Sequence, residues 1–298
     1  MTIGVGLLLF LVLLVSALGV AITLGVRRIT ARRRPDPPVS PADFALPYEE
    51  VVFLSRDGIT LRGWFMPASP RRGTIIFCHG QAGSMDADLH YAPAFHEHGY
   101  DVLMFDFRGH GRSGGNSVSM GYLEREDLLA AIEWLGRRGI TKLGVLGFSM
   151  GGAVAMMTAP SSPAVCAVVS DGGFASLDAP VEGWFVKKGA PGWLAGLLSG
   201  LTLWAAGIRL GVPLQQTRPI DYVADIAPRG LFLIQGGRDI FVPVAHAQAL
   251  FERAGQPKEL WIEPAANHRQ VDLVAPEQYL PRILAFFDRF FPASSPCL

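Results

Sequence analysis

One segment near the middle of the chain constrains its fold more than any other. Residues 143–148 are an apolar run that favours a strand, and residues 150–157 are rich in Ala and Met, which favour a helix. The chain must turn sharply between them, and Ser149 lies on that turn. Gly147 and Gly151 complete the pattern G-x-S-x-G, in which small residues permit the turn and hold the serine hydroxyl out at the end of the strand. A flexible Gly-rich connection could have the same five residues, so the interpretation depends on the rest of the chain.

Strand-like and helix-like segments alternate elsewhere in the chain. Two strand-like runs before residue 67 are separated by Ser55-Arg-Asp-Gly58, which predicts an antiparallel pair with a tight turn. The later alternation predicts a mostly parallel sheet with helices on both faces, and ligands bind such sheets at the carboxyl ends of the strands. We expect strands over 50–54, 61–66, 74–78, 101–105, 143–146, 165–170, 231–235 and 259–262, and helices over 88–98, 123–138, 244–254 and 276–291.

A nucleophilic serine needs a general base, and histidine is the usual one. His268 follows the last expected strand in Pro264-Ala-Ala-Asn-His268, where a loop can lean over the serine. His110 lies in a Gly-rich turn, and four others lie on expected helices: His90, His96, His98 and His246. We therefore expect His268 to be the base.

Two aspartates follow strand ends and could orient that base. Asp239 comes after strand 231–235 in Gly236-Gly-Arg-Asp239, and Asp171 comes after strand 165–170. Either one satisfies the chain order Ser, Asp, His. We favour Asp239 because the Gly-Gly turn gives a short loop that can reach the histidine, whereas Asp171 could equally be a turn residue.

Composition narrows the classes of function. Half of the 298 residues are apolar, which is enough for the core of a large α/β domain. Lys and Arg (26) balance Asp and Glu (26), so nothing indicates a nucleic-acid partner. The three cysteines have no even pairing, and Cys78 and Cys166 lie in apolar runs where a thiol packs as a small hydrophobe. We expect no disulfide and no metal site.

The N-terminal residues 1–26 predict a transmembrane anchor. No charged residue occurs from Ile3 to Val26, which gives about 36 Å of helix and is enough to span a bilayer. The arginines that follow predict a single-pass protein with its catalytic domain on the cytoplasmic side; they are Arg27, Arg28, Arg32, Arg33 and Arg34. The alternative is a cleaved signal peptide, which usually has its charges before a shorter apolar core.

Residues 27–47 are basic and then Pro-rich, which predicts a semi-rigid extended linker, with the folded domain over 48–298. An insertion over about 172–219 contains a run, 193–212, with Arg209 as its one charge. A second membrane crossing there would separate Asp239 and His268 from Ser149. We therefore expect a helical cap over the strand ends, with an apolar substrate lining or a membrane-facing lip supplied by residues that include Trp184, Phe185, Leu201 and Trp204. The alternative is a helix that only packs on the sheet.

The chain resembles the α/β-hydrolase-fold serine hydrolases, in particular the N-terminally anchored abhydrolase-domain proteins. These proteins include esterases, lipases and thioesterases. The resemblance covers about residues 48–291 and depends on five motifs in order: His79-Gly-Gln-Ala-Gly83, Asp106-Phe-Arg-Gly-His-Gly-Arg-Ser113, the Ser149 turn, Gly236-Gly-Arg-Asp239 and His268. It implies that the main-chain N–H groups of Gln81 and Met150 form the oxyanion hole. It also implies that Asp106, Arg108 and Gly109 shape a turn.

The resemblance implies hydrolysis of an ester or thioester through an acyl-enzyme, with a small-molecule or lipid acyl substrate and no metal or organic cofactor. A serine at the nucleophile position argues against dehalogenase and epoxide hydrolase chemistry. Three alternatives stay open: a membrane-tethered scaffold on a hydrolase fold, a peptidase and a cofactor-free haloperoxidase.

Overall fold

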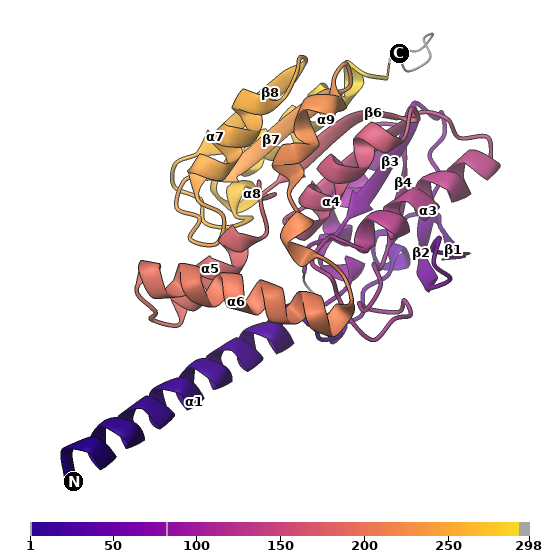
Figure 1. Ribbon diagram of the computed structural model, residues 1–298. Helices are drawn as coiled ribbons and strands as arrows, with labels where there is room; N and C mark the ends of the chain where they lie inside the picture. The colour runs from indigo at the N-terminus through magenta and orange to yellow at the C-terminus, as the bar shows by residue number, and fades with distance from the viewer. Residues whose placement is uncertain (1, 82, 292–298) are drawn as a thin grey trace.

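A computed structural model describes residues 2–81 and 83–291, in which eight strands form one mixed sheet (Figure 1). The strand order is β1-β2-β4-β3-β5-β6-β7-β8; the first two strands pair antiparallel, β2 also pairs antiparallel with β4, and the remaining pairs are parallel. The strands are β1 (Glu49–Leu54), β2 (Thr60–Met66), β3 (Gly73–Cys78), β4 (Tyr100–Phe105), β5 (Leu143–Phe148), β6 (Val165–Asp171), β7 (Gly230–Gly236) and β8 (Lys258–Glu263). The expected α/β-hydrolase fold is confirmed.

Helices cover both faces of the sheet because successive side chains of each central strand point to opposite sides. Val145 of β5 packs in the core beneath α3 (Glu124–Arg137), α4 (Met150–Thr158) and α7 (Val244–Arg253). Leu146, the next residue, packs in the second core beneath α2 (Ala92–Glu97), α8 (Val271–Val274) and α9 (Pro276–Asp288). The helix expected over 88–98 is shorter, because Met85–Tyr91 forms a 3-10 helix before α2.

Two helices lie between β6 and β7, within the insertion expected over 172–219. They are α5 (Asp178–Lys187) and α6 (Gly192–Leu210). The N-terminal helix α1 (Thr2–Thr30) projects from the domain, and its C-terminal end lies beside α6 (Figure 1). A Cβ added to Gly25 of α1 would lie 2.8 Å from Thr202 Oγ1 of α6, so the two helices approach closely there.

The segment expected as a semi-rigid extended linker, residues 27–47, is docked on the domain from the last turn of α1 onward. Ile29 and Thr30 are buried, and the Thr30 carbonyl accepts a hydrogen bond from the Val118 N–H at 3.0 Å. The Arg33 N–H donates to the Gly109 carbonyl at 2.8 Å, and further along the Ser84 N–H donates to the Asp36 carboxylate, also at 2.8 Å. The Pro-rich composition predicted an extended backbone, but its unpaired N–H and C=O groups find partners on the loops after β3 and β4.

The prediction of no disulfide is wrong at one position. Cys166, near the start of β6, is disulfide-bonded, whereas Cys78 at the end of β3 is a free, buried thiol. Spacing along the chain does not report which sulfur atoms the fold brings together, and bonding requires their Cα atoms to lie within a few ångströms of each other.

Candidate active site

Ser149 lies on a strained turn between β5 and α4. Its backbone has φ of 51° and ψ of −110°, a region that costs a non-glycine residue about 1–3 kcal/mol. A Cβ on Gly147 would clash with the Gly151 carbonyl, and a Cβ on Gly151 would clash with the Cys78 carbonyl. The two glycines of the motif are therefore required by close backbone approach, and the turn they permit presents the Ser149 hydroxyl at the carboxyl edge of the sheet.

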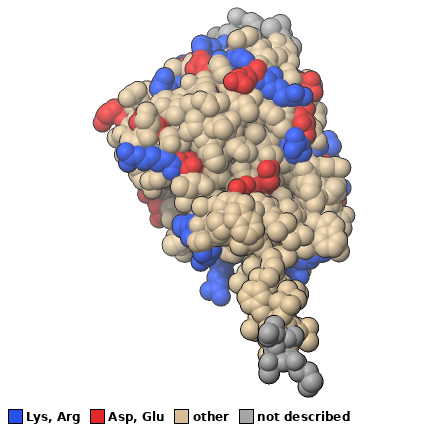
Figure 2. All heavy atoms as spheres, turned by 60° about the vertical axis from the view of Figure 1, so that its left-hand side comes forward, with Lys and Arg blue, Asp and Glu red and all other residues tan. Residues whose placement is uncertain are grey.

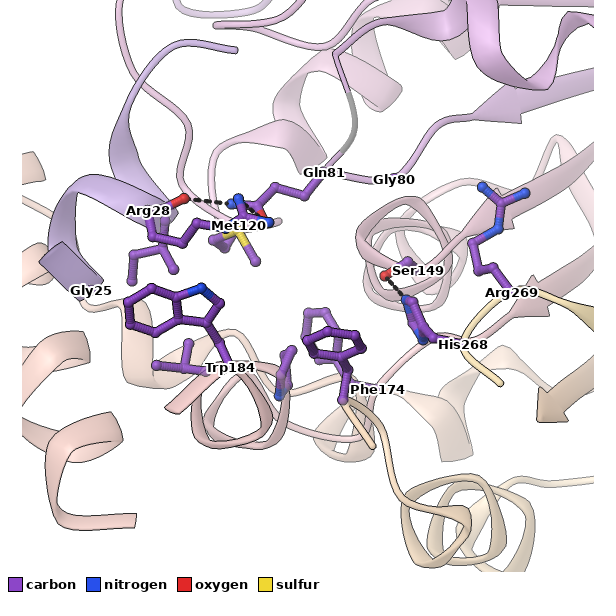
Figure 3. A pocket seen from close by; sticks show the side chains of 14 residues that line it. Gly25, Arg28, Gly80, Gln81, Met120, Ser149, Phe174, Trp184, His268 and Arg269 are labelled. Atoms are coloured by element: carbon purple, nitrogen blue, oxygen red, sulfur yellow. Dashed lines mark hydrogen bonds between the residues drawn. The ribbon is translucent and has the colours of Figure 1, made fainter. Parts of the chain in front are cut away.

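Ser149, His268 and Asp239 form one chain of hydrogen bonds. The Ser149 hydroxyl donates to His268 Nε2 at 2.9 Å, as Figure 3 shows, and His268 Nδ1–H donates to Asp239 Oδ2 at 2.6 Å. The carboxylate can only accept, so it selects the imidazole tautomer whose free Nε2 faces the serine. The three residues come from the turn after β5, the loop after β8 and the loop after β7.

The Asp239 carboxylate is held in position by hydrogen bonds on both of its oxygens. Its side chain is fully buried, and Oδ1 accepts hydrogen bonds from the N–H groups of Phe241 at 2.8 Å and Val242 at 2.9 Å. Oδ2, the oxygen that faces His268, also accepts from Gln235 Nε2 at 3.0 Å. These hydrogen bonds stabilise the negative charge of a carboxylate that is buried away from water.

Asp171, the alternative acid, contacts Tyr279 and Arg269 and not the imidazole of His268. Its Oδ2 accepts a hydrogen bond from the Tyr279 hydroxyl at 2.7 Å and lies 3.6 Å from Arg269 Nε. Burial raises the pKa of Asp171. The structure therefore brings Asp239, and not Asp171, into contact with His268.

Arg269 supports the histidine loop and was not singled out by the sequence patterns. It forms a hydrogen-bonded ion pair with Asp88 at 2.9 Å, and its guanidinium lies over the Phe148 ring, 4.0 Å from the centroid. Burial alone would lower the pKa of Arg269, but the carboxylates of Asp88 and Asp171 raise it. Its place directly after His268 was the signal available in the sequence, because a residue adjacent to the base shares its loop.

The other histidines lie away from Ser149. His110 is buried, and its Nδ1 contacts the Arg108 carbonyl at 2.9 Å; burial lowers its pKa. His98 contacts Asp288, and His246 accepts a hydrogen bond from the Ala175 N–H. Arg108 itself forms ion pairs with Asp57 and Asp127, a structural arrangement that holds the turn after β4.

Two main-chain N–H groups were expected to form the oxyanion hole, those of Gln81 and Met150. Within residues 2–81 and 83–291, neither Gln81 nor Met150 donates a main-chain hydrogen bond. The loop that bears Gln81 is fixed by His79, whose Nε2 accepts from the Phe107 N–H at 3.0 Å while Nδ1–H donates to the Gly80 carbonyl at 2.7 Å. Ala82 of this motif lies outside the described residues.

A cavity of about 300 Å³ opens beside Ser149 (Figure 3). Its apolar walls come from the cap, from loops and from the last turns of α1, through Ile29, Met120, Phe174, Val181, Trp184 and Phe241. Gly25 and Arg28 of α1 also line it, and the sequence did not indicate either one, because its pattern placed Gly25 in the anchor and Arg28 in the linker.

The four residues expected to line the substrate site occupy different places. Trp184 lines the cavity, and Phe185 is buried behind it, within 3.0 Å of a Cβ added to Gly25. Like Phe185, Leu201 and Trp204 do not line this cavity, and they are 36% and 60% exposed. The helix period explains their position, because α6 turns Leu198 and Leu203 toward the core and Trp204 toward the outside.

Among the described residues, no group of three or more His, Cys, Asp or Glu side chains is arranged to hold a metal ion. The sheet order, the strained serine turn and the hydrogen-bonded Ser-His-Asp arrangement define an α/β-hydrolase. The family model described as serine aminopeptidase, S33, matches residues 69–227. The chain belongs to this α/β-hydrolase family.

Relatives and solved structures agree with this assignment. The α/β hydrolase domain-containing protein WAV2 of Arabidopsis thaliana is 31% identical over 267 residues, covering 86% of this chain and 83% of that protein. The uncharacterized protein YfhR of Escherichia coli K12 is 29% identical over 236 residues, covering 74% and 73%. The Pyrococcus furiosus esterase Pf2001 superposes with a TM-score of 0.72 at 29% identity, covering 87% of this chain and 99% of the esterase. Together with the family match, this likeness supports hydrolase activity.

Proposed function

We propose that this protein is a membrane-anchored serine hydrolase that cleaves a carboxylic ester or thioester with an apolar acyl group. The observation that carries the proposal is the continuous hydrogen-bond chain from Ser149 through His268 to Asp239, together with the N–H groups of Gln81 and Met150, which donate no main-chain hydrogen bond among the described residues. Ser149, His268 and Gln81 line one cavity, and Asp239 is bonded to His268 on its buried side.

The geometry supports a two-step acyl transfer. His268 Nε2 takes the Ser149 proton as Oγ attacks the acyl carbonyl, and Asp239 stabilises the imidazolium that forms. The N–H groups of Gln81 and Met150 stabilise the tetrahedral oxyanion, at about 3 kcal/mol of barrier for each donor. The imidazolium then protonates the leaving group, and water repeats the sequence to release the acid.

The lining of the cavity favours an acyl substrate over a peptide N-terminus. An aminopeptidase must bind an α-ammonium group, for which a carboxylate is the natural partner. The cationic side chains that line the cavity are Arg28 and Arg269, and none of its described lining residues is Asp or Glu. Cationic walls would repel an ammonium group, whereas the aromatic and aliphatic walls fit an acyl chain.

Helix α1 supports the anchored form. Its side chains from Val5 to Val15 are exposed and almost wholly apolar, and two described helices are long and apolar enough to cross a membrane, over Val5–Thr30 and Gly192–Leu210. Cleavage as a signal peptide would remove Gly25 from the cavity wall, so we favour an uncleaved anchor. The arginine flank favours a cytoplasmic domain, although the disulfide at Cys166 is more typical of an oxidising compartment. Protease protection in vesicles of known orientation decides the side.

Labelling with a fluorophosphonate tests the proposal against the scaffold alternative. The wild-type protein should label and should hydrolyse an aryl ester. Ser149→Ala and His268→Ala should abolish turnover without changing the circular dichroism spectrum, and Ser149→Ala should also abolish labelling. Turnover by Ser149→Ala would refute the assignment of the nucleophile, and an unlabelled, inactive wild type would favour a scaffold.

A substrate panel then tests the class of leaving group. Matched esters, thioesters and amides of one acyl chain, together with an aminoacyl amide that has a free amine, separate the esterase and thioesterase proposal from a peptidase. Faster turnover of the free-amine amide than of the ester would contradict the proposal.

A further inference from the structure

Helix α6 exposes a continuous apolar stripe to solvent. Trp193, Leu197, Trp204 and Ile208 are 76%, 52%, 60% and 64% exposed. With Leu201 between them, these residues follow one another at steps of four, four, three and four, which places them on one face of a helix. The opposite face packs on the domain through Ala195, Leu198, Leu203 and Ala206. A soluble surface rarely exposes a patch of this kind without a partner.

The stripe lies next to the helix that we propose to cross the bilayer. Close approach at Gly25 and Thr202 places α6 against the C-terminal end of α1, at the level where a membrane-spanning helix leaves the lipid. Figure 2 shows α1 emerging from a broad face that is mostly uncharged, with one acidic group within it and both basic and acidic side chains at its margins. Exposed cations lie at the end of α5, which packs against α6, and near the end of α6 itself: Lys187, Lys188 and Arg209.

The fold does not allow α6 to cross the membrane as a single span. It lies between β6 and β7, which are parallel neighbours in the sheet, so the chain enters and leaves the insertion on one side of the bilayer. Seven of the 19 residues of α6 are also buried against the domain. An apolar face, cationic margins and tryptophans are instead the features of a helix that lies in the plane of the headgroups.

We propose that the exposed face of α6 is a lipid-docking surface that rests in the interfacial layer of a phospholipid bilayer. This inference depends on the membrane anchoring proposed above for α1. Gly25 and Arg28 lie across the cavity from Ser149 in Figure 3, and α1 packs against α6 at Gly25, so docking of α6 places the cavity beside the lipid phase. An acyl substrate then passes from the bilayer into the cavity without crossing water.

Depth-dependent quenching of a fluorophore tests the docking of α6. An environment-sensitive fluorophore is attached at Ile208→Cys in full-length protein reconstituted into phosphatidylcholine–phosphatidylglycerol vesicles. Lipids brominated near the headgroup should quench it more strongly than lipids brominated near the chain ends. A fluorophore at Val52→Cys, exposed on β1, is the matched control and should not be quenched.

A third position separates this inference from the anchoring proposal. A fluorophore at Leu14→Cys in α1 should be quenched most by deep bromines. Quenching at position 14 but not at 208 overturns the docking of α6 and keeps the anchor. Quenching at 208 but not at 14 overturns the anchor and keeps the lipid surface. Equal quenching by deep bromines at both positions overturns the interfacial placement of α6. A blue shift of the emission at position 208 without lipid, which grows with protein concentration, shows that a second copy covers the stripe and overturns the proposal.

Activity provides an independent readout. The double variant Trp193→Asp/Trp204→Asp should lower turnover of a vesicle-embedded ester by about tenfold, because it removes apolar burial in the interface. Turnover of a soluble aryl ester should not change, because neither residue lines the cavity. An equal loss on both substrates would indicate damage to the fold and would contradict the proposed role.

Discussion

Arg28 and Gln81 join the N-terminal helix to the oxyanion loop through two reciprocal hydrogen bonds. Arg28 Nη1 donates to Gln81 Oε1 at 3.0 Å, and Gln81 Nε2 donates to the Arg28 carbonyl at 3.1 Å (Figure 3). The main-chain N–H of Gln81 is one of the two proposed oxyanion donors. The last turn of α1, which the sequence placed at the start of the linker, therefore holds the residue whose N–H we propose as an oxyanion donor.

Removal of this contact should lower kcat more than it raises KM. Arg28→Ala and Gln81→Ala each loosen the loop but leave the Gln81 N–H in place, so we expect a loss of about tenfold in kcat, because an oxyanion donor acts mainly in the transition state. The double variant should be no slower than the slower single variant, because the two residues act through one contact. Arg209→Ala, on the outside of α6, is the control, and strictly additive losses would contradict the coupling.

Deletion of residues 1–34 should impair the enzyme even on a soluble ester. The deletion removes Gly25, Arg28 and Ile29 from the cavity wall, and it also removes the main-chain contact of Arg33 with Gly109. We expect a loss of roughly tenfold or more in kcat/KM, together with a lower thermal midpoint, because buried Ile29 is lost. Deletion of residues 2–20 spares these contacts and is the matched control. Near-normal turnover by the longer deletion would show that the docked segment is dispensable.

The two candidate acids should respond differently to removal of charge. Asp239→Asn loses the acceptor that fixes the His268 tautomer and should lower kcat by several orders of magnitude. Asp171→Asn should cost far less activity, because Asp171 contacts Tyr279 and Arg269 and not the imidazole. Steady-state kinetics with one aryl ester measures both variants. A larger loss in Asp171→Asn would move the orienting role to that residue.

The dependence of kcat/KM on the length of the acyl chain should show whether the apolar wall of the cavity binds that chain. Each buried methylene contributes up to about 0.8 kcal/mol, so two added carbons should raise kcat/KM by roughly tenfold until the cavity is full. At about 300 Å³ the cavity is at the small end for a ligand site, so we expect the rise from acetyl to end at medium chains. Trp184→Ala should flatten the rise, whereas Trp204→Ala should not, because it lies outside the cavity. A steady preference for acetate would show that the wall does not bind acyl chains.

The strand and helix order of this protein was predictable because it depends on local patterns. Apolar runs and turn residues located all eight strands, and the glycines flanking Ser149 located the sharp turn, since no larger residue fits between the strand and the helix there. Chain order and position at strand ends also indicated Ser149 and His268, because parallel strands bring their carboxyl ends to one edge. They left Asp239 and Asp171 as candidate acids, and the Gly-Gly turn favoured Asp239.

The roles of the N-terminal segment and of α6 could be decided only by the tertiary structure. Composition predicted an anchor followed by a semi-rigid extended linker. Whether Arg28 contacts Gln81 depends on the angle at which α1 meets the domain, and no local sequence pattern encodes that angle. Which face of an almost uniformly apolar helix packs inward is likewise ambiguous from sequence, so Trp204 was assigned to a cavity that it does not reach. Local propensity fixed the elements of this chain, whereas contacts between residues far apart in the sequence fixed the walls of its site.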